Sequence, residues 1–441
     1  MKLIGPADGG SSLSRLTPKK TTAVAVLDIG SSKICCMIAR LKPSEPGEAL
    51  PGRTHTVQLI GIGHQKARGV KSGAIVDLEA AERAIRLAVD AAERMARVTI
   101  DSLVVNVASG RLASETFSAQ VPVAGAEVGE ADIGRVLAAG RAHSVSEGRT
   151  VVHSLPIGYS LDGHRGVRDP RGMVGRTLGV DMHVVTANFA PLENLELCVN
   201  RSHLAIAATV ANPYASGLAT LVDDEADLGV VTVDLGAATT TMAVFLNGQF
   251  IHADGIAIGG HHITVDIARG LSTSLESAER LKLMHGSALV SGADDADILS
   301  VPPLGDEERE VPNRLPRAAL NRIIRARVEE ILELVRDRLN DSGFAALVGR
   351  RIVLTGGASQ LNGLAEAARR ILARNVRLGR PLGVSGLPEV ARGPSHATTV
   401  GMLIYPQAGG IELSAHRPEA VRATGTGGYF SRFSRWLKES F

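Results

Sequence analysis

Two stretches far apart in the sequence combine residue types that could bind a phosphate and a divalent cation. Residues 23–38 read AVAVLDIGSSKICCMI, and residues 230–245 read VVTVDLGAATTTMAVF. Each is an apolar run ending in an aspartate, then a turn of small residues, then a second apolar run, which predicts a strand, a tight turn and a returning strand. Small turn residues let backbone N–H groups approach a ligand, hydroxyls donate hydrogen bonds, and a strand-end carboxylate can hold Mg²⁺.

The two turns supply the candidate site residues. One such hairpin alone would most simply be an ordinary part of a sheet. The second copy favours two related half-domains that face one ligand. Asp28 and Asp234 are predicted to hold the metal, directly or through water. The residues predicted to contact the ligand are Asp28, Gly30, Ser31, Ser32 and Lys33 in the first turn, and Asp234, Gly236, Ala237, Ala238 and Thr239 in the second.

A third stretch adds a surface for a flat ring. Residues 351–364, RIVLTGGASQLNGL, combine a buried-type strand with paired glycines and the start of an amphipathic run. Because glycine has no side chain, a base and ribose can lie against bare backbone at Gly356 and Gly357, next to Ala358. Two hairpins followed by this strand predict a nucleotide clamp.

The elements that position these residues follow an α/β pattern. Asp77 is a predicted N-cap, and the helix after it repeats apolar residues on one face. A second, long helix follows a basic run and has its own apolar stripe. The predicted buried positions are Ile85, Ala88, Val89, Ala92 and Met95 in the first helix, and Leu320, Ile324, Val328, Ile331, Val335 and Leu339 in the second.

Composition limits the function classes. The 441 residues are 44% hydrophobic and 21% charged, as in ordinary globular proteins. The near balance of charge, 48 Lys plus Arg against 46 Asp plus Glu, argues against a nucleic-acid partner.

The cysteines and the apolar runs indicate the cellular compartment. The spacing of Cys35, Cys36 and Cys198 is that of neither a disulfide framework nor a metal site, which fits a reducing cytoplasm. Residues 1–21 lack an apolar signal-peptide core, and the longest apolar run, 204–222, is interrupted by Asn212 and Pro213, so neither export nor a membrane span is expected.

The C-terminal tail predicts a different membrane contact. Residues 406–428 have no apolar period and indicate a linker. Residues 429–441 then place aromatic and cationic side chains on opposite sides of a helix, which is typical of an interfacial membrane helix too short to span; a terminal helix packed on the domain is the alternative. The apolar face holds Tyr429, Phe430, Phe433, Trp436, Leu437 and Phe441, and the cationic face holds Arg432, Arg435 and Lys438.

The order of five motifs resembles a known signature. DIGSSK, NPYASGLATL, DLGAATTT, LTGGASQL and SHATTVG are similar to the nucleotide-binding motifs of the actin, Hsp70 and sugar-kinase superfamily. Within it, the chain most resembles the FtsA family of bacterial cell-division proteins, through LIGIGHQKARGVKSGAIVDLEAAERAI, HGSALV and the amphipathic tail. The resemblance implies an α/β, actin-like fold of two related RNase H-like halves around a nucleotide cleft, with an FtsA-type inserted subdomain, and ATP with Mg²⁺ as the ligand.

The resemblance also implies a domain layout. A leader at 1–21 precedes a first half that is interrupted by the inserted subdomain, and the second half carries a small subdomain of its own. The first half consists of residues 22–108, 188–221 and 391–405, and the inserted subdomain of residues 109–187. The second half consists of residues 222–253 and 328–390, and its small subdomain of residues 254–327. The linker is 406–428 and the membrane helix is 429–441.

The implied role is in division. The family resemblance implies a peripheral protein on the cytoplasmic side of the inner membrane at the septum, which polymerises, binds anionic lipids, anchors FtsZ and helps recruit later division proteins. The C-terminal peptide of FtsZ would dock on Met284, Arg314, Arg317 and Arg322. Ala237 and Ala238 replace two usual glycines, so weak or no ATPase activity is expected. No catalytic carboxylate of the kind that a sugar kinase needs is assigned, which disfavours a kinase. The alternatives are a small-molecule kinase of this superfamily and an Hsp70-like chaperone, which the lack of a following peptide-binding domain disfavours.

Overall fold

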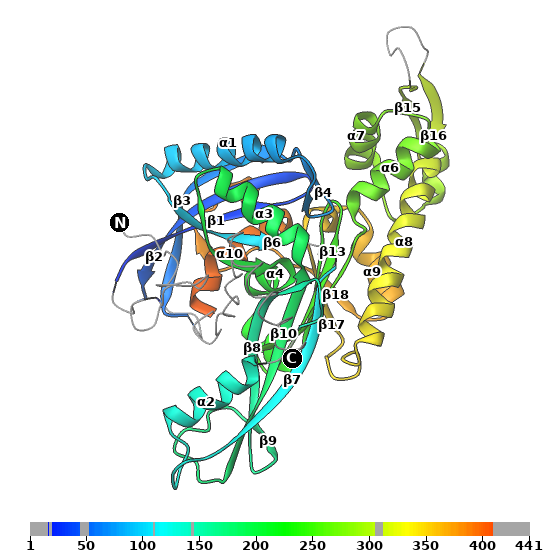
Figure 1. The fold of residues 1–441 in the computed structure, drawn as a ribbon. Coiled ribbons are helices and arrows are strands. Elements are labelled where there is room, and N and C mark those ends of the chain that lie inside the picture. Colours follow the sequence, from blue (N-terminus) through cyan, green and yellow to red (C-terminus); the bar gives the residue numbers. More distant parts are fainter. Residues whose placement is uncertain are drawn as a thin grey trace, which may run out of the picture.

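Two β-sheets of the same topology form the two halves of the protein (Figure 1). The computed structural model describes residue 16 and residues 20–44, 53–108, 111–142, 145–304 and 312–408. The sheet of the first half has the strand order β11-β6-β1-β2-β3-β19, and that of the second half has the order β14-β13-β12-β17-β18. In both, three antiparallel strands that follow one another in the chain continue into two parallel strands. The predicted α/β fold with two related halves is confirmed.

Most strands of the two sheets are apolar runs that are buried along most of their length, and the short outer strands β18 and β19 are more exposed. The first sheet consists of β1 (Thr22–Ile29), β2 (Lys33–Pro43), β3 (His55–Lys66), β6 (Ser102–Val107), β11 (Ala205–Ala211) and β19 (Val384–Ser385). The second consists of β12 (Val230–Leu235), β13 (Thr240–Leu246), β14 (Gln249–Ile256), β17 (Arg351–Thr355) and β18 (Asn375–Leu378). Near-continuous burial is expected for strands covered on both faces, and the equivalent strands β1 and β12 each end at one of the predicted metal-binding aspartates.

Helix α1 (Leu78–Ala96) covers one face of the first sheet (Figure 1). The side chain of Asp77 accepts a hydrogen bond from the Ala80 amide at 3.0 Å, as predicted for an N-cap. The predicted buried positions of this helix are confirmed except Met95, whose side chain is 58% exposed. The helix packs very close to β3, where a Cβ on Gly61 would collide with the backbone of Ala92 and the side chain of Ala96. Small residues fill this contact, so the longer Met95 lies outside it.

The inserted subdomain extends away from the two sheets at the bottom of Figure 1. Its own sheet has the order β7-β10-β8-β9, with β7 (Ala113–Pro122), β8 (Arg149–Leu161), β9 (His164–Val167) and β10 (Thr177–Asn188). Helix α2 (Glu130–Arg141) packs on this sheet through Ile133 and Val136, which join a separate hydrophobic cluster with Leu178 and Met182. A core of its own makes this part a subdomain rather than a long loop.

The small subdomain of the second half lies at the upper right of Figure 1. It contains α6 (Gly260–Gly270), α7 (Leu275–His285), the hairpin β15 (Ile298–Val301) and β16 (Asn313–Pro316), and the first part of α8 (Arg317–Asp341). The six predicted apolar positions of α8 are all buried in the core of the second half. Helix α8 therefore runs continuously from the small subdomain to the second sheet, which α9 (Leu364–Leu372) also covers.

Two helices cross between the halves. Helix α4 (Asn212–Thr220) contacts β12, β13 and β14 of the second sheet, and α10 (Ala397–Ala408) contacts β1, β2 and β6 of the first. Gly401 of α10 makes the crossing close, because a Cβ there would collide with the carbonyl oxygen of Ala215. Helix α10 includes residues 406–408, with Pro406 in its last turn, so the helix continues into the start of the predicted linker. The rest of 406–428 lies outside the described residues.

Candidate functional site

The predicted metal-binding residues, Asp28 and Asp234, come together where the two halves meet. We call them the carboxylate pair. Both lie near the carboxyl ends of equivalent strands, β1 and β12, and both side chains are buried. Adjacent threonines at the start of α10 bind one carboxylate each: Thr399 Oγ1 donates to Asp28 Oδ2 at 2.7 Å, and Thr398 Oγ1 donates to Asp234 Oδ2 at 2.8 Å. Two hydroxyls on consecutive residues thus hold the two carboxylates in one site.

Asn106, at the end of β6, is a third polar group in the site that the sequence did not reveal. Its amide nitrogen donates to Asp28 Oδ1 at 2.9 Å and to Asn212 Oδ1 at 3.0 Å, and its oxygen accepts from the Ile29 amide at 2.6 Å. The only signal in the sequence was one polar residue inside the apolar strand SLVVNV. Asn106 links the first carboxylate to Asn212 at the start of α4.

Burial shifts the ionisation of the site. It raises the pKa of Asp28, a rise that Lys33 and the Thr399 hydrogen bond partly offset. Burial also raises the pKa of Asp234 to about 6; the Thr398 hydrogen bond lowers this pKa, and the charge of Asp28 raises it. Burial lowers the pKa of Lys33, although the negative charges of Asp28 and Asp234 act to raise it. The protein therefore does not fully neutralise the negative charge of the two carboxylates, and a divalent cation would supply the missing positive charge.

The first predicted phosphate turn, 30–33, is fixed by neighbouring backbone. The Gly30 amide donates to the Lys33 carbonyl at 3.0 Å and closes the turn. Ser31 Oγ accepts from the Gly73 amide at 3.1 Å, and the Ser32 carbonyl accepts from the Ala67 amide at 2.9 Å. The glycine-bracketed segment 69–73 therefore supports this turn.

The second predicted turn, 236–239, is fixed by the start of α6. Gly236 donates to the Thr239 carbonyl at 2.9 Å, and the carbonyls of Gly236 and Ala237 accept from the Gly260 and His261 amides at 2.9 and 2.6 Å. In the part of the chain that the structure describes, the amides of Ser31, Ser32, Ala237 and Ala238 have no hydrogen-bond partner. Both turns thus offer pairs of unused N–H groups of the kind that bind phosphate oxygens.

The paired glycines after β17 have different surroundings. Gly356 adopts a φ of +85°, and a Cβ there would collide with Asp234 Oδ1 and lie within 2.5 Å of the Leu235 carbonyl oxygen. For Gly357 the nearest heavy atom to an added Cβ is Ser395 Cβ at 3.8 Å, an ordinary van der Waals distance. Gly356 is thus required to fit the second carboxylate, whereas the surroundings of Gly357 would accept a side-chain atom. The assignment of both glycines and Ala358 to a nucleoside remains a prediction.

The four predicted docking residues lie on the small subdomain of the second half, and two of them, Arg317 and Arg322, already form ion pairs within it. Met284 of α7 is 70% exposed, and Arg314 of β16 is exposed. Arg317 bonds to buried Asp294 at 2.6 Å and to Asp297 at 2.9 Å, and Arg322 lies 3.5 Å from Asp295. The Arg317 side chain therefore already supports the local fold. The predicted membrane residues at 429–441 lie outside the described residues.

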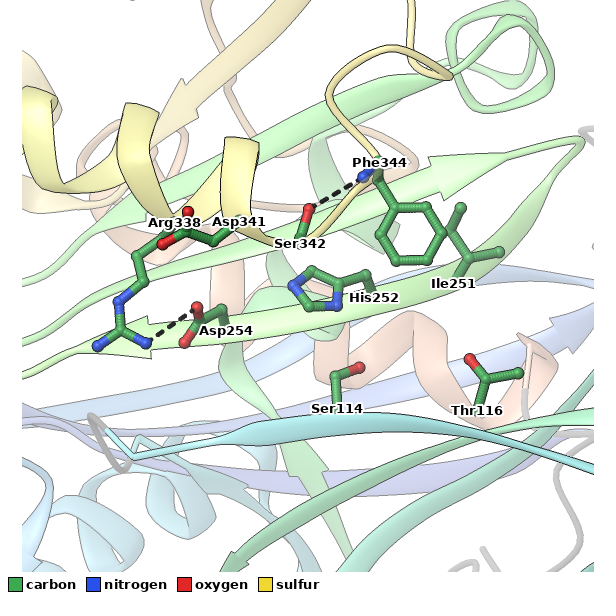
Figure 2. Close-up of a pocket in the computed structure, with 9 residues that line it drawn as sticks. All are labelled: Ser114, Thr116, Ile251, His252, Asp254, Arg338, Asp341, Ser342 and Phe344. Atoms are coloured by element: carbon green, nitrogen blue, oxygen red, sulfur yellow. Dashed lines mark hydrogen bonds and ion pairs between the residues drawn. The ribbon is translucent and has the colours of Figure 1, made fainter.

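A cavity of about 500 Å³ lies apart from the carboxylate pair, at the junction of the inserted subdomain and the second sheet (Figure 2). The edge strand β7 forms one side, through Ser114 and Thr116, and β14 with the C-terminal end of α8 forms the other. Some of its polar groups have partners: Arg338 lies 3.5 Å from Asp254, and Ser114 Oγ accepts from the Ala253 amide at 3.0 Å. His252 Nε2 is buried without a hydrogen-bond partner among the described residues. We assign this cavity no ligand.

Solved structures with the same architecture identify the class of fold. The chain is similar to the PilM-PilN type IV pilus biogenesis complex, with a TM-score of 0.58 and 16% identity over 87% of this chain and 98% of that one. It is also similar to MreB5 of Spiroplasma citri bound to ADP, with a TM-score of 0.51 and 12% identity over 88% and 96%. The fold is actin-like, as predicted.

Sequence comparisons identify the family. The family described as "Cell division protein FtsA" matches residues 231–401, and the SHS2 domain inserted in FtsA matches residues 109–186. The chain is 57% identical to the cell division protein FtsA of Rhizobium meliloti (strain 1021) over 444 residues, covering 100% of both, and 31% identical to that of Escherichia coli (strain K12), covering 95% and 98%. The chain belongs to the FtsA family of cell division proteins, which confirms the resemblance. Among the described residues, no helix has the length and apolar character needed to cross a membrane.

Proposed function

We propose that this chain is an ATP-binding division protein that polymerises on the cytoplasmic side of the inner membrane at the septum, anchors FtsZ there and helps recruit later division proteins. The nucleotide part rests on one observation: two buried strand-end carboxylates, one from each half, meet at consecutive threonines of α10. Family membership supports the division role over the small-molecule kinase. The inserted subdomain is the proposed surface for self-association and later division proteins.

The donor set of the site suits Mg²⁺ bound to a nucleotide. Mg²⁺ usually takes one or two protein carboxylates and completes its octahedron with water and phosphate oxygens. Asp28 and Asp234 supply two carboxylates, and no group of three or more potential metal ligands among His, Cys, Asp and Glu occurs within the described ranges. In the proposed complex the phosphates contact the unused amides of the two turns, and the nucleoside lies beside Gly357. The metal, when bound, neutralises phosphate charge.

The first test removes each carboxylate singly. Asp28→Ala and Asp234→Ala are each expected to weaken Mg·ATP binding by about 10- to 100-fold, because a metal ligand is lost where the phosphate charge concentrates. Binding of a fluorescent ATP analogue, titrated with Mg²⁺ and again with EDTA, measures the effect, which should disappear in EDTA. Asp254→Ala is the matched control, since this aspartate lies outside the site and pairs with Arg338. Unchanged Mg·ATP affinity in both single variants would show that the metal assignment is wrong.

FtsZ docking is proposed on the exposed face formed by Met284, Arg314 and Arg322. An acidic, partly apolar peptide would bury the methionine and pair with the arginines, which raises the association rate as well as affinity. A charge-reversal variant that includes Arg317 would be a poor test, because removing this arginine leaves Asp294 buried without its charge partner.

The docking test therefore keeps Arg317. Met284→Glu combined with Arg314→Glu is expected to lower the affinity for the C-terminal FtsZ peptide at least about tenfold, a loss of roughly 1.4 kcal/mol, by introducing two like charges. Fluorescence anisotropy of the labelled peptide measures this, and ATP binding should stay at the wild-type level. Met95→Glu is the matched control, because Met95 is also exposed and also the penultimate residue of its helix. Equal peptide binding by the double variant would place the dock elsewhere.

A further inference from the structure

Thr398 and Thr399 of α10 differ from Ser216 and Thr220 of α4 in the groups that their hydroxyls bond to. Within a helix, a Ser or Thr hydroxyl commonly donates to the carbonyl four residues earlier. Ser216 and Thr220 of α4 do this, at 2.8 and 2.7 Å. Thr398 and Thr399, in the first turn of α10, donate to carboxylates instead. Both side chains are buried, so their hydroxyl groups cannot donate to bulk water instead of to the carboxylates.

The ordinary acceptor for Thr398 is already used. The carbonyl of Pro394, four residues earlier, accepts from the Gly356 amide at 3.2 Å and from Thr355 Oγ1 at 3.3 Å. Both donors come from the second half, at the end of β17. The start of α10 is therefore tied to the second half by backbone and side-chain bonds, while the body of α10 packs on the first sheet.

The threonine bond fixes how the second carboxylate is oriented. Asp234 Oδ2 accepts from Thr398, and Asp234 Oδ1 lies against the Cα of Gly356, where a Cβ would collide with it. The first carboxylate is held at both oxygens, by Asn106 at Oδ1 and Thr399 at Oδ2. Asp234 Oδ2 is held by Thr398, which belongs to a helix of the other half, and the Ser216 hydroxyl of α4 also lies near enough to lower the pKa of Asp234.

We propose that Thr398 is a positioning residue for metal-nucleotide binding: its hydroxyl holds Asp234 of the second half at a fixed orientation and spacing relative to Asp28 of the first half. This inference rests on the proposed Mg·ATP site. The adjacent Thr399, in the same helical turn, holds the carboxylate of Asp28. The first turn of one helix therefore fixes the relative positions of both proposed metal ligands. Groups that orient metal ligands typically change metal affinity by about 10- to 100-fold when removed.

The test separates the hydroxyl from the packing of Thr398. Thr398→Val keeps the shape and removes the donor, whereas Thr398→Ser keeps the donor and removes a methyl group. We expect Thr398→Val to raise the Mg²⁺ concentration needed for half-maximal ATP-analogue binding about tenfold, with unchanged binding in EDTA, and Thr398→Ser to behave as the wild type. Thr220→Val is the matched control, because Thr220 is buried in a helix and bonds only to its own helix carbonyl.

A further pair of variants protects the test against misfolding. If Thr398→Val fails to fold, Thr398→Ala and Thr398→Ser are compared, since both lose the methyl group and only the first loses the hydroxyl. Equal Mg²⁺ dependence of these two variants, or of Thr398→Val and the wild type, would overturn the inference. A wild type that binds no nucleotide, or full binding by both aspartate variants, would instead overturn the proposed function, so the two failures are distinct.

Discussion

Gly356→Ala is expected to reduce Mg·ATP binding by at least about 100-fold, the upper end of what disturbed metal ligation costs. The new Cβ would lie 2.3 Å from Asp234 Oδ1 and 2.5 Å from the Leu235 carbonyl oxygen, so the carboxylate must move from its present position. The backbone of Gly356, with φ of +85° and ψ of 164°, adds strain of about 1–3 kcal/mol for any residue with a Cβ. Titration of a fluorescent ATP analogue with and without Mg²⁺ gives the binding loss, and thermal unfolding gives the stability loss.

Two controls isolate the cause of the loss in Gly356→Ala. Gly134→Ala adds the same methyl group within α2, where no heavy atom lies within 4 Å, and should leave both measurements at the wild-type level or raise stability slightly. Gly357→Ala adds it at the neighbouring residue, where the nearest atom, Ser395 Cβ, is 3.8 Å away, and should leave thermal stability nearly unchanged. If Gly356→Ala bound Mg·ATP as tightly as the wild type, the coupling of this glycine to Asp234 would be refuted.

Removal of residues 429–441 is expected to release the protein from anionic liposomes. A helix this short is marginal in water, because nucleation is costly and few bonds propagate it. On a bilayer, buried aromatic area contributes about 25 cal/mol per Å², and each cation near an anionic leaflet contributes roughly 1 kcal/mol. One tail would bind weakly and reversibly, and ATP-dependent polymerisation would strengthen attachment because neighbouring tails act at high effective concentration. Co-sedimentation with liposomes, with and without ATP, measures both effects.

A single substitution makes the liposome result specific to the apolar face. Trp436→Glu should lower co-sedimentation to the level without liposomes, whereas Trp436→Phe keeps an aromatic ring and should retain most of it. Neither variant should alter ATP binding, since the carboxylate pair lies on other elements. Equal sedimentation of the truncated and full-length chains would contradict the proposed membrane anchor.

The features that were predictable from the sequence are those set by local patterns. Strand–turn–strand periodicity identified both hairpins, and the 3.6-residue period identified the buried stripe of α8. Met95 was the exception, because the close approach of α1 to β3 depends on Gly61, in a strand far from the end of that helix. Which residues share one face of a helix is local information, but how much space the neighbouring sheet leaves is not.

The partners of the carboxylate pair were not predictable for the same reason. Asn106 and Thr399 lie far from Asp28 in the sequence, and only the sheet order and the return of α10 bring them together. The two glycines after β17 looked equivalent in the sequence, and their surroundings distinguish them: a Cβ on Gly356 would collide with Asp234, whereas a Cβ on Gly357 would make only an ordinary contact with Ser395. Motif order predicted which carboxylates belong to one site, whereas the hydrogen bonds around them are a product of the tertiary fold.

The return of the chain to the first half has a consequence for protein synthesis. Helix α10 and strand β19 complete the first half, although they follow the whole second half in the chain: Val384 pairs with Val57, and Val400, Met402 and Leu403 join the first hydrophobic core. A ribosome emits the chain from its N-terminus, and domains generally fold as units. All strands of the second sheet leave the ribosome before α10 does. The first half therefore begins to be translated before the second half, but its hydrophobic core can be completed only after the second half has been made. Until then, the nascent β1 and β2 expose the apolar surface that α10 will cover, so strands made early in translation depend on residues 397–405, made much later, for their burial.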